Sequence, residues 1–146
     1  RTQAKTKAID VRNPLGRVLK VGEDNFKKDI DTLELKLAEA IMAERPAIDQ
    51  GIGFIKIISV IAPLAGLLGT VTGMIVTFQM ITLYGTGDPK LMAGGISQAL
   101  VTTVLGLLVA IPTSLLHSFT QSSARGIISI LEEQSTGILA ERAESK

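Results

Sequence analysis

The sequence predicts an all-α membrane protein built around a helical hairpin, whose two long transmembrane helices extend into the cytoplasm. Residues 57–83 and 91–116 contain no charged residue. Each stretch has about 26 residues, whereas a helix needs only about 20 to cross the hydrocarbon core of a bilayer. The composition agrees, because 46% hydrophobic residues with only 3% aromatic ones are typical of a small membrane protein rather than a compact soluble domain.

Composition also argues against several classes of function. The chain has no cysteine, so it offers no disulfide framework, thiolate metal site or cysteine nucleophile. Acidic residues are interspersed among the basic residues of positions 1–45, and there is no series of aromatic residues interleaved with them, a pattern that does not indicate nucleic-acid binding. The sequence contains no nucleophile and base pair and no cluster of metal ligands, so we expect no enzymatic activity, no metal and no cofactor.

The N-terminal region, residues 1–30, is predicted to be a basic cytoplasmic segment with a short helix. Asn13 and Pro14 form a turn signal, and Leu15, Val18 and Leu19 follow at helical spacing. Because this apolar pattern is short, it supports only one or two helical turns.

Residues 31–56 are predicted to form a cytoplasmic amphipathic helix. Asp31 and Glu34 have the spacing of a capping box, which places the start of the helix near Asp31. Pro46 interrupts the pattern, so we expect a bend or a brief break there before the apolar pattern resumes. The apolar face comprises Leu33, Leu37, Ala40 and Ile41.

The hairpin itself consists of a transmembrane helix at residues 57–83, a periplasmic loop at 84–90 and a second transmembrane helix at 91–117. The loop reads YGTGDPK, in which two glycines can end the first helix. Asp88 can cap the second helix, and Pro89 suits its first position. We therefore expect a tight connection between antiparallel helices.

The distribution of positive charge predicts the topology. Ten of the fifteen Lys and Arg residues lie within residues 1–45, and the connecting loop contains only Lys90. By the positive-inside rule, we expect both ends of the chain in the cytoplasm and the connecting loop on the other side, so the protein is predicted to be a multi-pass membrane protein. Residues 118–146 continue the apolar stripe and are predicted to form a cytoplasmic helix.

Small and hydroxyl side chains recur on both predicted spans at steps of three and four residues, so they form one strip on each helix. Two interpretations remain open from this spacing: close packing of the two helices, or a polar pathway along them. The packing residues are Gly66, Gly69, Gly73, Ala99, Gly106 and Ala110. The residues that could line a pathway are Thr70, Thr77, Gln98, Thr102 and Thr103.

Neither charge-free stretch, 57–83 or 91–116, contains an acid or a histidine, and this limits what a pathway could do. A proton relay needs a group that titrates near the middle of the membrane, and hydroxyls and amides do not titrate near neutral pH. A partner would therefore have to bring the ionisable side chain. Pro112 frees a carbonyl late in the second span, where it is either a mechanical kink or only a local bend.

Two motifs carry a resemblance to a known family. APLAGLLGTVTGMIVTF at residues 62–78 and MAGGISQALVTTVLGLLVAIP at residues 92–112 closely resemble the ExbB and TolQ proton-channel subunits, with the flagellar stator protein MotA more distant. Within the family the match is most similar to ExbB-like, TtpC-type subunits of accessory TonB systems. Those subunits have a preceding first transmembrane helix, which this chain is expected to lack.

The resemblance implies a homo-oligomeric ring, generally a pentamer, around an ExbD-type subunit whose membrane helix supplies an aspartate. The family's pore threonines match Thr70 and Thr103, which would hydrogen-bond that aspartate. Gln98 departs from the family, which commonly has a glutamate at this place. A TonB-type protein would complete the assembly, within the lipid of the inner membrane.

The function implied by the resemblance is a pore-forming subunit of a proton-driven motor that energises TonB-dependent transport across the outer membrane. Two alternatives stay open. One is a TolQ-like or MotA-like stator for envelope maintenance or motility. The other is a non-conducting assembly scaffold, in which the glycine strips only pack helices.

Overall fold

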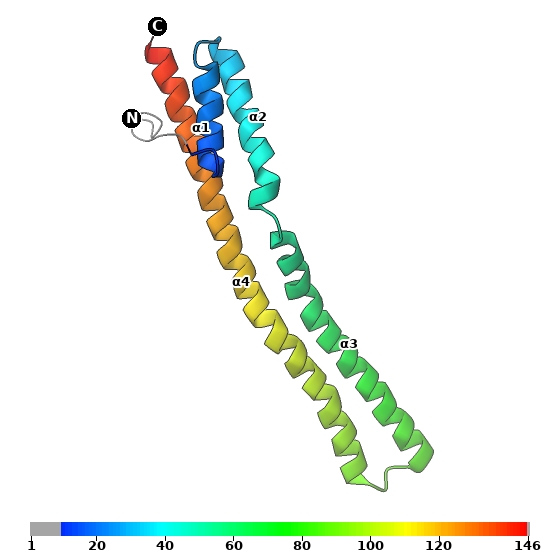
Figure 1. The fold of residues 1–146 in the computed structure, drawn as a ribbon. Helices are drawn as coiled ribbons and strands as arrows, with labels where there is room; N and C mark the ends of the chain where they lie inside the picture. The colour runs from blue at the N-terminus through cyan, green and yellow to red at the C-terminus, as the bar shows by residue number, and fades with distance from the viewer. Residues whose placement is uncertain (1–9, 146) are drawn as a thin grey trace. The chain divides into compact units, whose positions relative to one another are not determined.

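The computed structural model describes residues 10–145, which fold into four α-helices with no strand among them. The helices are α1 (Pro14–Asn25), α2 (Ile30–Ile48), α3 (Ile52–Tyr84) and α4 (Pro89–Glu144) (Figure 1). Residues 1–9, the start of the predicted basic segment, lie outside the described range. The predicted all-α fold with two long apolar helices is confirmed.

The described chain divides into two compact units. The terminal unit comprises residues 10–50 and 121–145, and the hairpin unit comprises Gly51–Thr120. Helix α4 contributes its first part to the hairpin unit and its last part to the terminal unit.

The core of the terminal unit is built by α1, α2 and the last part of α4. Asn13 caps α1, because its side-chain oxygen accepts a hydrogen bond from the Gly16 backbone at 2.6 Å, and Pro14 occupies the first helical position. Apolar side chains then face inward on all three helices, adjacent in sequence on α1, one turn apart on α2 and two turns apart on α4. The buried cluster is Val18, Leu19, Leu33, Leu37, Ile41, Leu131 and Ile138.

Helix α2 starts one residue from its predicted place near Asp31, but its cap differs from the prediction. The helix begins at Ile30 after Asp29, and Asp29 makes no side-chain capping hydrogen bond. Asp31 lies inside the first turn, so it is not the cap of a capping box. An acidic side chain in the first turn still favours the helix, because the N-terminal end carries a partial positive charge.

The interruption predicted at Pro46 lies elsewhere. Helix α2 continues through Pro46 to Ile48, and the chain turns at Gly51, whose φ of 81° is in the left-handed region. Pro46 is close to the end of α2, so its missing N–H removes only one hydrogen bond from the last turn. The left-handed conformation, which glycine adopts without steric cost, separates α2 from α3.

An ion pair joins α1 to α2. The Nε and Nη2 groups of Arg17 donate to the two carboxylate oxygens of Glu44 at 2.6 and 2.7 Å. This two-point geometry is the strong form of an arginine and carboxylate contact. The hydrogen bond from Arg17 holds the pKa of Glu44 below its ordinary value, against the opposing effect of burial.

The lowered pKa of Glu44 predicts that acid weakens the attachment of α1. The pair contributes stability above the unfolded-state pKa of the glutamate, and that contribution is lost as the pH falls through the lower folded-state value. As the pH falls below the ordinary pKa of a glutamate and through the lower folded-state pKa of Glu44, we expect the Arg17 Nε–H resonance of the detergent-solubilised protein to lose its hydrogen-bonded shift. Glu44→Gln should abolish this pH dependence; if the dependence persisted in Glu44→Gln, its assignment to this pair would be wrong.

The hairpin unit consists of α3, a short turn and the first part of α4. Gly85, with φ of 73°, ends α3. The Asp88 carboxylate then accepts hydrogen bonds from the backbone N–H groups of Lys90 at 3.0 Å and Leu91 at 3.4 Å. The glycine stop and the Asp88 cap predicted from the sequence are therefore confirmed.

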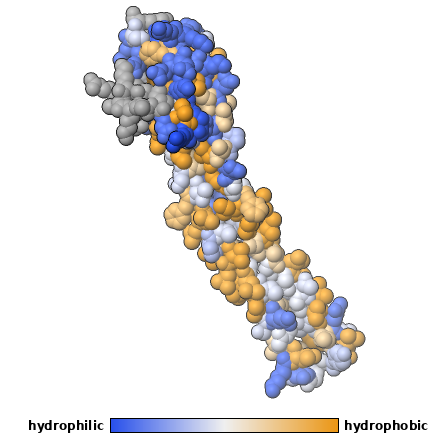
Figure 2. All heavy atoms as spheres, in the orientation of Figure 1, coloured by the Kyte–Doolittle hydropathy of each residue, from blue (hydrophilic) through white to orange (hydrophobic). Residues whose placement is uncertain are grey.

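The outer surface of the hairpin unit is apolar. Helices α3 and α4 are each long and apolar enough to cross a membrane, with a mean hydropathy of 2.1 in their most apolar windows. Few residues of those windows are buried, and large side chains such as Leu68 and Leu108 are 68% and 62% exposed. Figure 2 shows hydrophobic side chains over the hairpin and mostly hydrophilic ones over the terminal unit. Such a surface matches a lipid environment.

Candidate functional site

The contact between α3 and α4 is formed by the small residues of the two predicted strips. A methyl group added to Gly106 would lie 2.7 Å from the Ala62 carbonyl oxygen and 2.9 Å from the Gly66 Cα. A methyl added to Gly73 would lie 3.0 Å from the Ala99 Cα. The backbones are therefore too close for side chains at these positions. We call this contact the seam, defined by Gly66, Gly69, Thr70, Gly73, Thr77, Gly95, Ala99, Thr102, Thr103 and Gly106.

Two threonines meet near the middle of the seam. The hydroxyl of Thr70 on α3 hydrogen-bonds the hydroxyl of Thr103 on α4, and either oxygen can be the donor. The Thr70 hydroxyl is also within hydrogen-bond distance of the carbonyl oxygens of Gly66, at 3.2 Å, and Ala99, at 3.3 Å. Both side chains are half-buried. The structure thus brings together the two residues that the family resemblance assigns to the pore.

Thr102 adds polar contacts at the level of Thr70 and Thr103. Its hydroxyl lies 2.6 Å from the Ala99 carbonyl oxygen on its own helix and 3.3 Å from the Gly66 carbonyl oxygen across the seam. The Gly66 carbonyl oxygen therefore faces two hydroxyls, one from each helix. A carbonyl oxygen has two lone pairs, so it can accept both hydrogen bonds.

The side chains at the level of Thr70 and Thr103 are polar, but none of them is an acid or a base. Residues 57–83 and 91–116 contain no Asp, Glu, His, Lys or Arg, and the described residues hold no group of metal-binding side chains. Each hydroxyl has one proton to donate and two lone pairs, so a hydroxyl that donates to a carbonyl can still accept. The seam can therefore hydrogen-bond a carboxyl group brought to it, but it cannot itself hold and release a proton near neutral pH.

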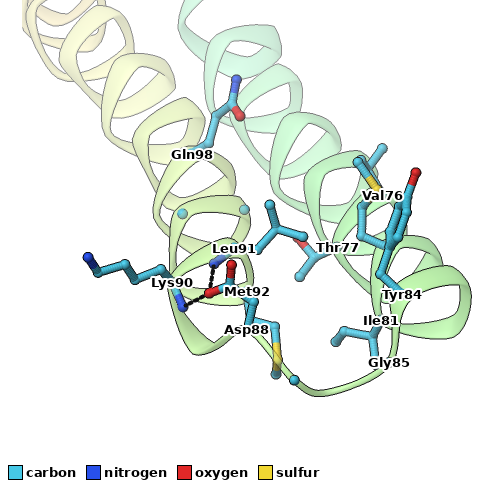
Figure 3. A pocket seen from close by; sticks show the side chains of 14 residues that line it. Val76, Thr77, Ile81, Tyr84, Gly85, Asp88, Lys90, Leu91, Met92 and Gln98 are labelled. Atoms are coloured by element: carbon cyan, nitrogen blue, oxygen red, sulfur yellow. Dashed lines mark hydrogen bonds between the residues drawn. The ribbon is translucent and has the colours of Figure 1, made fainter.

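Thr77 and Gln98 lie apart from the Thr70 level. Thr77 is 4% exposed, donates to the Gly73 carbonyl oxygen at 2.9 Å and packs against Gly95. Gln98 is exposed. Both line a hollow of about 550 Å³ next to the hairpin turn, together with Tyr84 and Met92 (Figure 3). The five predicted pathway residues thus divide between two levels of the hairpin.

The residues predicted to pack the helices mostly lie where the backbones meet. Gly66, Gly69, Gly73 and Gly106 face the opposite helix, and Ala99 is 1% exposed. Ala110 is also buried, at 6% exposed. Pro112 lies within α4, which continues past it to Glu144. Packing and polar contacts thus occupy the same strip, so the two interpretations of the spacing are compatible.

Sequence reasoning did not find the carbonyl acceptors of the seam. The carbonyl oxygens of Gly66 and Ala99 accept hydrogen bonds across the hairpin, yet glycine and alanine carry no polar side chain that would point to this role. The only signal of this role in the sequence is that a small residue on one helix could lie opposite a threonine on the other. That relation depends on how the helices are aligned, which a single sequence does not specify.

Known proteins resemble this chain over most of its length. The family model described as the MotA/TolQ/ExbB proton channel family matches residues 10–133. A putative biopolymer transport protein, an ExbB homolog from Methanothermobacter thermautotrophicus, is 36% identical over 112 residues, which cover 74% of this chain and 38% of that protein. A putative biopolymer transport protein, ExbB-like 3, from Synechocystis is 36% identical over 102 residues, covering 68% of this chain and 49% of the relative.

The biopolymer transport protein ExbB of Aquifex aeolicus is 47% identical over 58 residues, 40% of this chain and 39% of that protein. The chain thus spans between 38% and 49% of the length of these three relatives. The resemblance carried by the two membrane motifs is confirmed. Because the family model covers most of its residues, the chain belongs to the MotA/TolQ/ExbB proton channel family.

Proposed function

We propose that this chain is the pore-forming subunit of a proton-driven motor in the bacterial inner membrane, which works with an ExbD-type partner to energise TonB-dependent transport across the outer membrane. The observation that carries the proposal is the Thr70 and Thr103 hydroxyl pair, set in two stretches of membrane length, residues 57–83 and 91–116, that contain no acidic, basic or histidine side chain. The ExbB relatives, which are described as biopolymer transport proteins, support the same role.

The proton would be carried by a partner residue. A hydroxyl does not titrate near neutral pH, whereas an aspartate on an ExbD-type membrane helix can take up and release a proton. Thr70 and Thr103 would hydrogen-bond this carboxyl group as its charge changes. Copies of the present chain would surround the partner as a ring, a pentamer in this proposal, with both chain ends in the cytoplasm.

The membrane potential limits the energy that each proton can deliver to such a motor. Moving one charge through the membrane potential yields about 2.3 kcal/mol per 100 mV. One proton therefore supplies only a few kcal/mol. Several protons would be used for each mechanical event that a TonB-type protein transmits to the outer membrane.

The test removes both hydroxyls and leaves the side-chain shape. In Thr70→Val with Thr103→Val, we expect proton flux through the reconstituted complex to fall by at least about tenfold, because hydrogen bonds to a charged carboxylate are lost. Growth that depends on outer-membrane transport should fall with it. The partner subunit should still copurify, since valine occupies nearly the same volume as threonine.

Two control variants make this test specific. Thr70→Ser with Thr103→Ser keeps both hydroxyls and should retain flux. Thr72→Val removes an exposed hydroxyl that donates to the Leu68 carbonyl oxygen of its own helix, so its flux should stay normal. Unchanged flux in the double valine variant, with the partner bound, would defeat the pore assignment.

One observation favours a second candidate, a non-conducting assembly scaffold. The hydroxyls of Thr70, Thr77 and Thr102 each have a carbonyl acceptor within the hairpin, as packing alone requires. A scaffold would show no proton flux either with or without its partner. A TolQ-like or MotA-like stator would conduct, and the partner that copurifies with it would distinguish it from a TonB system.

A further inference from the structure

A second hollow, of about 410 Å³, lies in the terminal unit between the end of α2 and α4. It is lined by four charged side chains and two neutral polar ones. The α4 residues among them recur at helical spacing, so they share one face of that helix. The polar lining is Arg45, Asp49, Gln121, Arg125, Ser129 and Glu132.

The charges in this hollow are incompletely satisfied by the protein. Arg45 and Glu132 approach only to 3.7 Å, which is longer than a hydrogen bond. Within residues 10–145, neither the Arg125 guanidinium nor the Asp49 carboxylate has an ion-pair or hydrogen-bond partner. The hollow therefore presents two cations and two anions, all of them exposed, that can still form hydrogen bonds with a ligand.

The end of α2 adds to the negative side of the hollow. Asp49 is the residue that follows the last turn of α2. The last carbonyl groups of a helix carry a partial negative charge, which favours a cation nearby. A positively charged group is thus favoured beside Asp49, while the guanidinium groups of Arg45 and Arg125 are suited to phosphate oxygens.

The sequence around the hollow indicates where its ligand comes from. Asp49 precedes the first charge-free stretch, residues 57–83, by eight positions, and Gln121 follows Leu116, the end of the second, by five. Between the hollow's residues and these stretches lie Phe54 and Phe119, which are 69% and 72% exposed. Exposed apolar rings that lie in the sequence between charged residues and a long charge-free stretch are typical of the boundary between membrane and water.

We propose that this hollow binds a phosphate ester that carries an amine, the headgroup chemistry of phosphatidylethanolamine. Arg45 and Arg125 hold the phosphate by charge-assisted hydrogen bonds. Asp49 and Glu132 hold the ammonium group. Glu132, which lies 3.7 Å from Arg45, thereby gains a cation within hydrogen-bond distance. The mixed charges of the site distinguish such a zwitterion from a purely anionic lipid, whose headgroup leaves the two carboxylates without a cation.

The test measures lipid binding by the purified, delipidated protein in mild detergent, using native mass spectrometry. We expect phosphatidylethanolamine to bind about tenfold more tightly than phosphatidylglycerol, which has the phosphate but no amine. Arg125→Gln should weaken phosphatidylethanolamine binding about tenfold by removing a charge-assisted hydrogen bond. The matched control, Arg12→Gln, removes an arginine of the terminal unit outside the hollow and should change nothing.

The carboxylates are tested by their effect on lipid preference. Glu132→Gln should reduce the preference for phosphatidylethanolamine over phosphatidylglycerol, whereas the neighbouring Glu133→Gln should leave it intact. Competition with free O-phosphoethanolamine shows where the ligand comes from. If the free ester does not displace the lipid, the site binds a membrane headgroup. If the free ester competes as well as the lipid, the site binds a soluble ester. Equal binding of the two lipids, or equal effects of Arg125→Gln and Arg12→Gln, would overturn the proposal.

Discussion

Replacing Gly106 with leucine is expected to force α3 and α4 apart and to destabilise the hairpin unit by about 3 kcal/mol. A Cβ atom at this position would lie 2.7 Å from the Ala62 carbonyl oxygen and 2.9 Å from the Gly66 Cα. Both neighbours are backbone atoms, so neither can rotate away. The free energy of unfolding, measured in mixed micelles with increasing dodecyl sulfate, should report the loss.

Gly94 provides the matched control for this substitution. It is another glycine of α4, and a Cβ there would meet nothing within 4 Å. Gly94→Leu therefore gains the same helix propensity, about 1 kcal/mol relative to glycine, without a clash. We expect it to be neutral or slightly stabilising. Equal destabilisation by both variants would mean that the seam is not a close backbone contact.

Truncating Leu33 to alanine is expected to have a comparably large effect in the terminal unit, a loss of about 2–5 kcal/mol. The Leu33 side chain is fully buried, at 0% exposed, in the cluster that joins α1, α2 and the last part of α4. Its removal leaves a cavity that the surrounding side chains fill only in part. Hydrogen exchange of the α1 and α2 backbone amides should show the resulting fall in the free energy of local unfolding.

Leu35 lies two residues further along the same helix and is 70% exposed. Leu35→Ala has the same chemistry and the same change in helix propensity, but it removes no core contact. We expect its amide exchange to match the unsubstituted protein within about 0.5 kcal/mol. If Leu33→Ala and Leu35→Ala had similar effects, the buried cluster would not be what stabilises this unit.

The parts of the fold that were predictable depend on local physics. Long charge-free stretches indicate membrane-length helices because the thickness of the bilayer sets their length. Asp88 could be predicted as a helix cap because its hydrogen bonds reach only two or three residues along the chain. The break between α2 and α3 was wrongly predicted at Pro46, because a proline near the end of a helix removes only one backbone hydrogen bond. The left-handed conformation of Gly51 is the actual cause, and nothing distinguishes this glycine from Gly53 in the sequence alone.

The site was predictable as two strips but not as a set of contacts. Helical spacing shows which residues share a face, so the glycines and threonines of the seam could be assigned. It does not show which residue on α3 lies opposite which on α4. The match of Thr70 with Thr103 therefore came from a family resemblance, whereas the grouping of Thr77 with Gln98 near the turn came only from the structure.

The hydrogen bond between Thr70 and Thr103 can run in either direction, and the two hydroxyls differ in what else they can reach. When Thr103 donates to Thr70, Thr70 can donate its own hydrogen bond to the Gly66 or Ala99 carbonyl oxygen, and Thr103 can then act only as an acceptor toward another group. When Thr70 donates, the Thr103 proton is released to bond elsewhere. The pair is thus a reversible dipole that presents an acceptor to a protonated carboxyl group and a donor to an ionised one. Its polarity can follow the charge of a partner without any movement of the backbone.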